Sequence, residues 1–175
     1  MGIWTTLSDQ MRHFRTLVVD DVEDFRHFFC SKLEQGTEYE VVGEASDGLQ
    51  AVLQAQQLQP DLILLDIGLP TLNGIEAARQ IRNVSRASKI LFVSENRSPD
   101  IIKAAFTSGA CGYVVKSDAA SQLLPALNAV LEGKRFVSAS LAAHDLVTSH
   151  TRASEEGNCV KDNTYLGLSG HALIS

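Results

Sequence analysis

The sequence predicts an α/β fold built on a doubly wound parallel sheet. Short apolar runs alternate along the chain with longer stretches whose apolar residues recur every three or four positions. This alternation indicates repeated strand–helix units, and right-handed crossovers then place helices on both faces of the sheet. With 175 residues, 45% of them hydrophobic, the chain is long enough for one ordinary domain and a short appendage.

Five apolar runs are typical of strands covered on both faces, because they are short and nearly free of polar residues. They occupy residues 16–20, 40–45, 61–66, 89–94 and 112–116. A stretch of helical periodicity follows each run, and we expect its apolar stripe to face the core. These stripes lie within residues 25–33, 49–58, 75–81, 101–106 and 123–131.

The chain divides into three parts. Residues 14–134 hold the five strand–helix units, and residues 1–13 form an N-terminal extension. In residues 135–175, Phe136 and Val137 can begin a short strand or helix, but no sustained period follows, so we expect a mostly disordered linker and tail. This segment also lacks the basic, helix-rich pattern of a DNA reader, so we expect no DNA-binding domain in it.

Composition excludes several classes of function. The net charge of −6 disfavours direct binding of nucleic acids through their phosphates. The longest apolar runs are far shorter than the roughly 20 residues of a membrane-spanning helix. The amino terminus does not read as a secretory signal, so a cytoplasmic location is expected.

Polar residues stand where four of the predicted strands end. Asp20 and Asp21 follow the first strand, Asp66 the third, Ser94 the fourth and Lys116 the fifth. In open α/β sheets, ligands bind at the carboxyl ends of the strands, so these side chains should share one rim. Each taken singly can be a helix cap or a solvated charge, but their coincidence at four strand ends favours a site.

The chemistry of this set points to phosphoryl transfer. Clustered carboxylates repel one another unless a cation neutralises them, and a few carboxylates with water and phosphate oxygens suit Mg²⁺. An Asp can attack phosphorus, while a Lys and a Ser hold the transferred oxygens. Asp47 and Gly48, by contrast, follow the second strand and are interpreted as a helix cap with a turn glycine.

These residues resemble the receiver domain of two-component response regulators over about residues 14–134. The resemblance rests on LVVDD at 17–21, DLILLDIGLPTLNGIEAARQIR at 61–82, ILFVS at 90–94 and SGACGYVVKS at 108–117. The segment GYVVKS and the later LLPALNAVLEGKRFVS are similar to the LuxR-type (NarL/FixJ) branch. The resemblance implies a flavodoxin-like (βα)5 sheet with strand order 2-1-3-4-5.

The resemblance also implies roles for the rim residues. Asp66 would be the phosphoacceptor, and Mg²⁺ would be held by Asp20, Asp21, Asp66 and the backbone carbonyl of Gly68. Ser94 and Lys116 would contact the phosphoryl oxygens, and Ser94 and Tyr113 would form the switch. The phosphoryl donor would be a sensor histidine kinase or a phosphotransfer protein. The fourth helix, fifth strand and fifth helix would meet partners, with a homodimer left open.

Three features depart from the family pattern. Glu95 follows the switch hydroxyl, where a small residue is usual; its carboxylate can repel the phosphodonor, accept from Lys116 or point to solvent. Ser117 follows Lys116 in place of proline, so we expect a trans peptide bond. Too few residues follow Arg135 for a helix-turn-helix effector, which favours a stand-alone receiver or a truncated LuxR-type transcriptional regulator.

Other functions compete with the phosphorylation-dependent receiver. A binding or scaffold module of the same fold would not need phosphate. A haloacid-dehalogenase-type phosphatase is disfavoured because Gly68 stands where its second Asp is required, and the acidic first loop opposes a flavin phosphate. The chain is therefore expected to act on no separate substrate and to catalyse only its own aspartyl phosphorylation and dephosphorylation.

Overall fold

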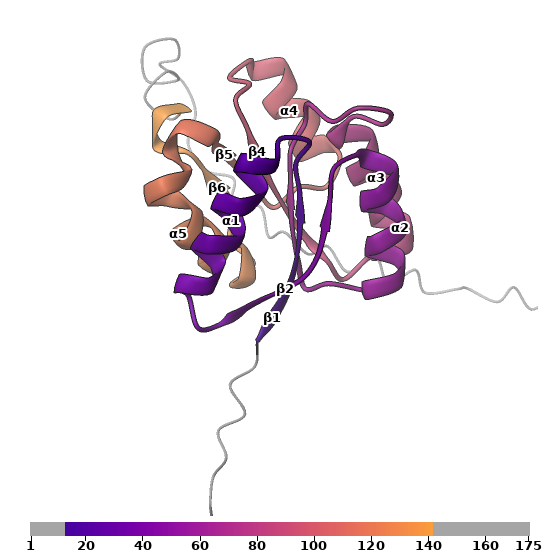
Figure 1. The fold of residues 1–175 in the computed structure, drawn as a ribbon. Coiled ribbons are helices and arrows are strands. Elements are labelled where there is room, and N and C mark those ends of the chain that lie inside the picture. Colours follow the sequence, from indigo (N-terminus) through magenta and orange to yellow (C-terminus); the bar gives the residue numbers. More distant parts are fainter. Residues whose placement is uncertain (1–12, 142–175) are drawn as a thin grey trace, which may run out of the picture.

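The computed structural model describes residues 13–141 of the chain, which form a three-layer α/β domain (Figure 1). Its parallel sheet has the strand order β2-β1-β3-β4-β5-β6. This confirms the doubly wound sheet and the order predicted for its first five strands. The strands are β1 (Phe14–Val19), β2 (Tyr39–Ala45), β3 (Leu62–Leu65), β4 (Lys89–Ser94), β5 (Gly112–Val115) and β6 (Phe136–Val137).

Helices cover both faces of the sheet, as the alternating pattern predicts (Figure 1). Residues of α1 and α5 pack on one face, and residues of α2, α3 and α4 pack on the other. A short 3-10 turn (Lys116–Asp118) connects β5 to α5. The helices are α1 (Glu23–Gln35), α2 (Gly48–Leu58), α3 (Gly74–Val84), α4 (Pro99–Thr107) and α5 (Ala119–Leu131).

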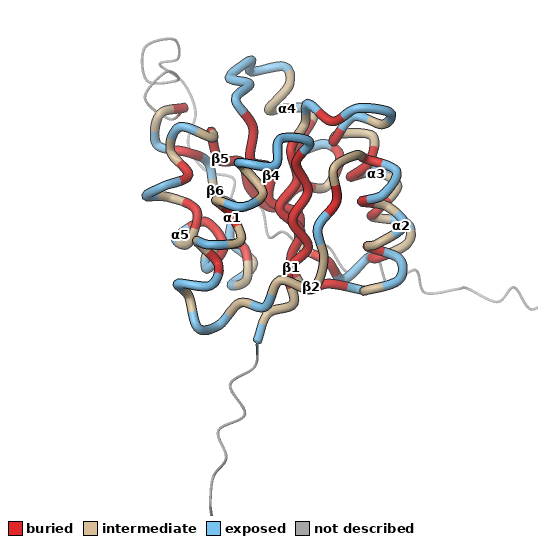
Figure 2. Tube along the Cα trace, in the orientation of Figure 1, coloured by how far each residue is buried: buried red, intermediate tan, exposed pale blue. Residues whose placement is uncertain are grey.

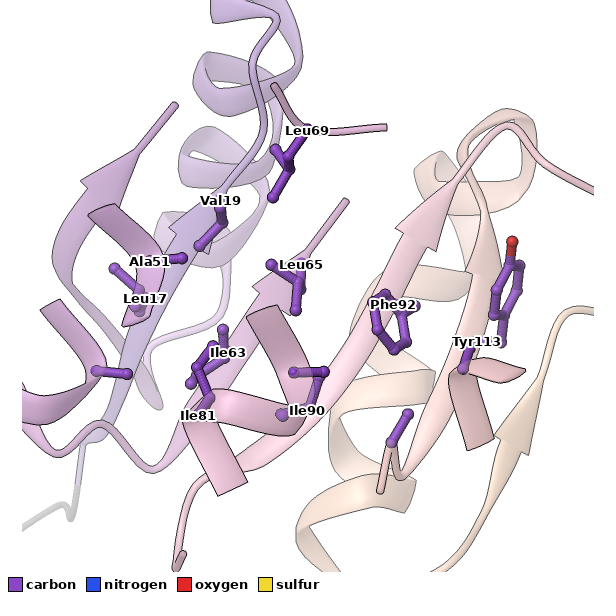
Figure 3. Close-up of a cluster of buried hydrophobic side chains, with 14 of the residues drawn as sticks. Leu17, Val19, Ala51, Ile63, Leu65, Leu69, Ile81, Ile90, Phe92 and Tyr113 are labelled. Atoms are coloured by element: carbon purple, nitrogen blue, oxygen red, sulfur yellow. The ribbon is translucent and has the colours of Figure 1, made fainter. Parts of the chain in front are cut away.

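The central strands form the core: their residues are buried (red in Figure 2), and helices cover both faces of the sheet. Every residue of β3 and β5 is buried. Figure 3 shows one of the two clusters, in which Leu17, Ile63 and Ile90 from successive neighbouring strands lie beside Ala51 of α2 and Ile81 of α3. Such burial on both faces explains why the strands read as nearly continuous apolar runs.

The packed domain continues past residue 134. β6 adds a sixth strand at the edge of β5, where the Phe136 N–H donates to the Cys111 carbonyl. Ser138 is fully buried, and Leu141 joins the core on the α4 side. The remainder of the tail (142–175) and of the N-terminal extension (1–12) lies outside the described residues, so the disorder predicted for the tail stays a prediction.

Local sequence explains how the helices begin. Asp47 caps α2 by accepting a hydrogen bond from the Gln50 N–H, which confirms the cap predicted there. Asn73 caps α3 in the same way through the Glu76 N–H. Within residues 13–141, no helix combines the length and the apolar character needed to cross a membrane.

Candidate functional site

All the predicted rim residues except the buried Asp20 line a cavity of about 500 Å³ at the carboxyl ends of the strands. Asp66 and Gly68 lie on the loop after β3, Ser94 ends β4, and Lys116 follows β5. The parallel strands bring these positions together, although they are far apart in sequence. The lining also includes Asp21, Val22, Phe25, Ile67, Glu95 and Asn96.

Three carboxylates meet beside this cavity. Asp20, Asp21 and Asp66 each place a carboxylate oxygen within 4.8 Å of the other two. Asp20 and Asp66 are held by the sheet itself, because the Asp20 N–H donates to Ala45 O (3.1 Å) and the Asp66 N–H to Val19 O (2.9 Å). The β-ladder thus fixes the backbone beneath both carboxylates, while Asp21 is exposed.

Lys116 forms ion pairs with the two inner carboxylates. Its Nζ lies 2.7 Å from Asp20 Oδ2 and 3.2 Å from Asp66 Oδ2, and the Lys116 side chain is 6% exposed. Burial raises the pKa of Asp20, whereas the contact with Lys116 and the hydrogen bond from the Val22 N–H oppose that rise. The energy of a buried ion pair of this kind depends on its geometry, because each partner has lost its hydrating water.

The acidic cluster fits a small divalent cation. Asp20 Oδ2 is buried and accepts no hydrogen bond within the described part of the chain, so its one neutralising contact there is the ion pair with Lys116. Asp21 and Asp66 offer further carboxylate oxygens on the cavity side, and Gly68 lies in the cavity wall. Oxygen ligands with space for water are what Mg²⁺ requires.

Asp66 is oriented by its immediate neighbours. Its Oδ1 accepts a hydrogen bond from the Ile67 N–H (2.7 Å), which leaves Oδ2 toward Lys116. Gly74, at the start of α3, packs directly beneath, because a Cβ at this position would lie 1.9 Å from the Asp66 carbonyl oxygen. A glycine is therefore required for α3 to approach the end of β3.

The two predicted switch residues lie together on the β4–β5 side. Ser94 is 4% exposed and Tyr113 is fully buried, with its ring beside Phe92 (Figure 3). The Tyr113 hydroxyl donates to the Asn96 carbonyl (2.7 Å), so it is attached to the loop that leads into α4. Burial raises the pKa of Tyr113 to about 12, despite the opposing hydrogen bond with Ser94.

The structure also shows the surroundings of Glu95 and Ser117, the two residues that depart from the family pattern. Glu95 is exposed on the cavity rim, and the salt bridges of Lys116 within residues 13–141 go to Asp20 and Asp66 and not to Glu95. Of the three alternatives for Glu95, acceptance from Lys116 is therefore wrong. The peptide bond between Lys116 and Ser117 is trans, as predicted.

Comparison with known proteins decides the family. Residues 16–128 match the family described as the response regulator receiver domain. This chain belongs to that family. The chemotaxis protein CheY of Thermotoga maritima is 34% identical over 116 residues, which cover 66% of this chain and 96% of CheY.

The relatives also include LuxR-type regulators. The transcriptional regulatory protein LiaR of Bacillus subtilis is 33% identical over 142 residues, which cover 81% of this chain and 66% of LiaR. A solved LuxR-family response regulator from Aurantimonas sp. SI85-9A1 has a TM-score of 0.72 at 34% identity, covering 77% of this receiver and 99% of that chain. The LuxR-type resemblance is thereby confirmed. The receiver spans 58 to 66% of the length of the first matching curated regulators.

Two residues of structural importance were not found by sequence reasoning. Phe25 packs against the core, as expected from the stripe of the first helix, but its ring also lies beside the Lys116 ammonium, whose Nζ is 4.1 Å from the ring centroid. Ser138 donates its N–H to Tyr113 O, and its Oγ accepts the Val115 N–H (2.9 Å). Their local sequence carries no signal for either contact, because both are made with residues of β5 and the turn after it.

Proposed function

We propose that this receiver accepts a phosphoryl group on Asp66 and thereby switches a protein-interaction surface. The observation that carries the proposal is the placement of Asp66 Oδ2 3.2 Å from Lys116 Nζ, in a cavity that also holds Asp21 and Ser94. A carboxylate nucleophile, an ammonium and a hydroxyl are the groups that phosphoryl transfer to an Asp requires.

The chemistry follows from the charges of these groups. A carboxylate oxygen of Asp66 forms a bond to phosphorus, while the bond between phosphorus and the donor breaks and its electron pair stays with the donor. Lys116 and Ser94 then face the phosphoryl oxygens as charge develops on them. Asp20, Asp21 and Asp66, with the Gly68 carbonyl, would hold Mg²⁺, which supplies positive charge to the same oxygens.

The donor we propose is a sensor histidine kinase or a phosphotransfer protein, whose phosphohistidine supplies the phosphoryl group. The reaction is confined to the receiver's own Asp66, so the chain needs no separate substrate. Ser94 and Tyr113 would report the modification to α4, because the Tyr113 hydroxyl binds the Asn96 carbonyl in the loop before that helix. A homodimer and a cytoplasmic location stay predictions of the sequence.

The proposal is tested by intact-mass measurement after incubation with acetyl phosphate and Mg²⁺. The wild-type chain should gain one phosphoryl group as an acid-stable, base-labile adduct, and Asp66→Asn should gain none. Asp47→Asn is the matched control, because Asn preserves the cap of α2 and position 47 is not among the cavity-lining residues.

Two results would count against the proposal. An adduct that persists in Asp66→Asn would place the phosphoryl group elsewhere. A wild-type chain that binds Mg²⁺ by calorimetry but acquires no adduct would favour the second candidate, a receiver-like module that binds partners without phosphate. The observation behind this candidate is the exposed carboxylate of Glu95 on the rim of the cavity, where its charge would repel an anionic donor.

A further inference from the structure

The Lys116 ammonium has a neighbour besides the two carboxylates. The ring of Phe25, in the first turn of α1, lies with its centroid 4.1 Å from Lys116 Nζ. Asp20 Oδ2 and Asp66 Oδ2 are 2.7 and 3.2 Å from the same nitrogen. The ammonium is thus enclosed by the ends of β1 and β3 and by an aromatic ring from α1.

The ring of Phe25 is itself held in place. It stacks on Phe29, with the ring centroids 6.1 Å apart and the planes at 17°. Phe29 is 2% exposed and belongs to the core between the sheet and the layer of α1 and α5. Phe28 packs edge-on against Phe29 from the same helix. Packing against Phe29 therefore holds the Phe25 ring in place where it lines the cavity.

An aromatic face suits this position for a physical reason. It attracts a cation through its quadrupole, yet it offers no lone pair that would compete with carboxylate or phosphoryl oxygens for the ammonium hydrogens. Lysine has a flexible four-carbon stem, and the carboxylate of Glu95 lines the same cavity as an alternative partner. The ring of Phe25 favours the arrangement in which Lys116 faces Asp20 and Asp66.

We infer that Phe25 is a positioning residue for the reaction at Asp66, acting through Lys116. It holds the ammonium above the two carboxylates, where the oxygens of an incoming phosphoryl group would arrive. The inference rests on the proposed phosphorylation of Asp66. Its structural part, the cation–π contact that orients Lys116, is measurable without any phosphorylation.

The test compares Phe25→Leu, Phe25→Tyr and the matched control Phe28→Leu. Leu at position 25 preserves an apolar side chain but removes the ring, whereas Tyr restores a ring face. Phe28→Leu makes the same chemical change on the same helix and against the same Phe29 ring, but Phe28 contacts Lys32 and not Lys116. Similar melting temperatures of the two Leu variants would show that any difference between them does not come from stability.

The first readout is NMR of ¹³C-labelled lysine, with the Lys116 signal assigned through Lys116→Arg. Ring current should shift the Lys116 ε protons upfield in the wild type and in Phe25→Tyr, and Phe25→Leu should remove that shift. The second readout is the rate of labelling by acetyl phosphate with Mg²⁺. We expect it to fall about tenfold in Phe25→Leu and to change less than about twofold in Phe25→Tyr and Phe28→Leu.

The outcomes separate this inference from the proposed function. An unshifted Lys116 signal in the wild type, or labelling slowed equally in Phe28→Leu and Phe25→Leu, would overturn the role of Phe25. Absence of any wild-type adduct would instead overturn phosphorylation of Asp66, and the NMR comparison would still decide whether Phe25 orients Lys116.

Discussion

β3 and β5 are both four-residue strands with every residue buried, and each is followed directly by a charged site residue, Asp66 or Lys116. They differ in their support. β3 pairs along its full length with β1 and β4, whereas β5 pairs along its full length with β4 and over two residues with β6. The centre of the sheet therefore determines where Asp66 lies, while Lys116 depends also on the segment that follows α5.

The largest effect is expected from removing the ion pair that links the ends of β3 and β5. Lys116→Ala leaves the buried carboxylates of Asp20 and Asp66 without their ammonium. We expect the free energy of unfolding to fall by about 3 kcal/mol or more, because a buried charge loses its partner. Mg²⁺ should restore more stability to this variant than it adds to the wild type.

Urea unfolding with and without Mg²⁺ checks this expectation. Lys134→Ala is the control, since Lys134 pairs with Glu132 at the exposed surface and should change stability far less than Lys116→Ala does. Equal losses in the two variants, or no additional stabilisation of Lys116→Ala by Mg²⁺, would contradict the role assigned to the buried pair.

Gly74→Ala tests how closely α3 packs against the end of β3. The new Cβ would lie 1.9 Å from the Asp66 carbonyl oxygen, a backbone atom fixed by the sheet, so α3 or the end of β3 must move. A loss of about 3 kcal/mol in urea unfolding is expected. Gly68→Ala is the control, because its Cβ would make an ordinary contact 3.5 Å from Asp66 Oδ2. Comparable stability of the two variants would show that α3 does not press on β3.

Ser138→Ala tests the support of β5. Its buried hydroxyl accepts the Val115 N–H at 2.9 Å, and removing it leaves that N–H without this acceptor inside the protein. The expected loss is about 2 kcal/mol by urea unfolding. Ser140→Ala, which removes a more exposed hydrogen bond to Asp118, should cost less than Ser138→Ala, because water can replace the lost partner. If Ser138→Ala were as stable as Ser140→Ala, β5 would not need this segment.

The smallest effect is expected at Glu95, on the exposed loop between β4 and α4. Glu95→Gln removes a negative charge from the cavity rim, so labelling by acetyl phosphate should become about two- to fivefold faster at low salt. The difference should shrink as salt screens the charge. Glu38→Gln, which is not among the residues lining this cavity, should have no such effect. A rate that is unchanged at low salt would show that Glu95 does not oppose the donor.

The residues of the rim could be predicted because their position depends only on local sequence and on strand topology. Asp20, Asp66, Ser94 and Lys116 each end or follow an apolar run, and parallel strands necessarily bring such ends to one edge. The cap at Asp47 was predictable for a similar reason, since one side chain and the next turn of helix suffice to make it.

The contributions of Phe25 and Ser138 were not predictable in this way. Phe25 belongs to an apolar stripe, and the stripe alone does not distinguish a ring in the core from a ring over a lysine of another element. Phe136 and Val137 can form a strand or a helix in sequence terms, and their pairing with β5 was decided by the open edge of that strand.

The sequence by itself determined the strand–helix alternation, the sheet type and the residues gathered at the carboxyl edge, because these follow from period and order along the chain. Only the tertiary structure decided which partners the charges take. Lys116 faces Asp20, Asp66 and Phe25, and not Glu95, because the sheet and α1 bring those three groups around one ammonium. From the sequence alone, Asp20, Asp66 and Glu95 are equally suitable carboxylate partners for Lys116. The distances between elements decide which of them it pairs with, and no local sequence pattern encodes those distances.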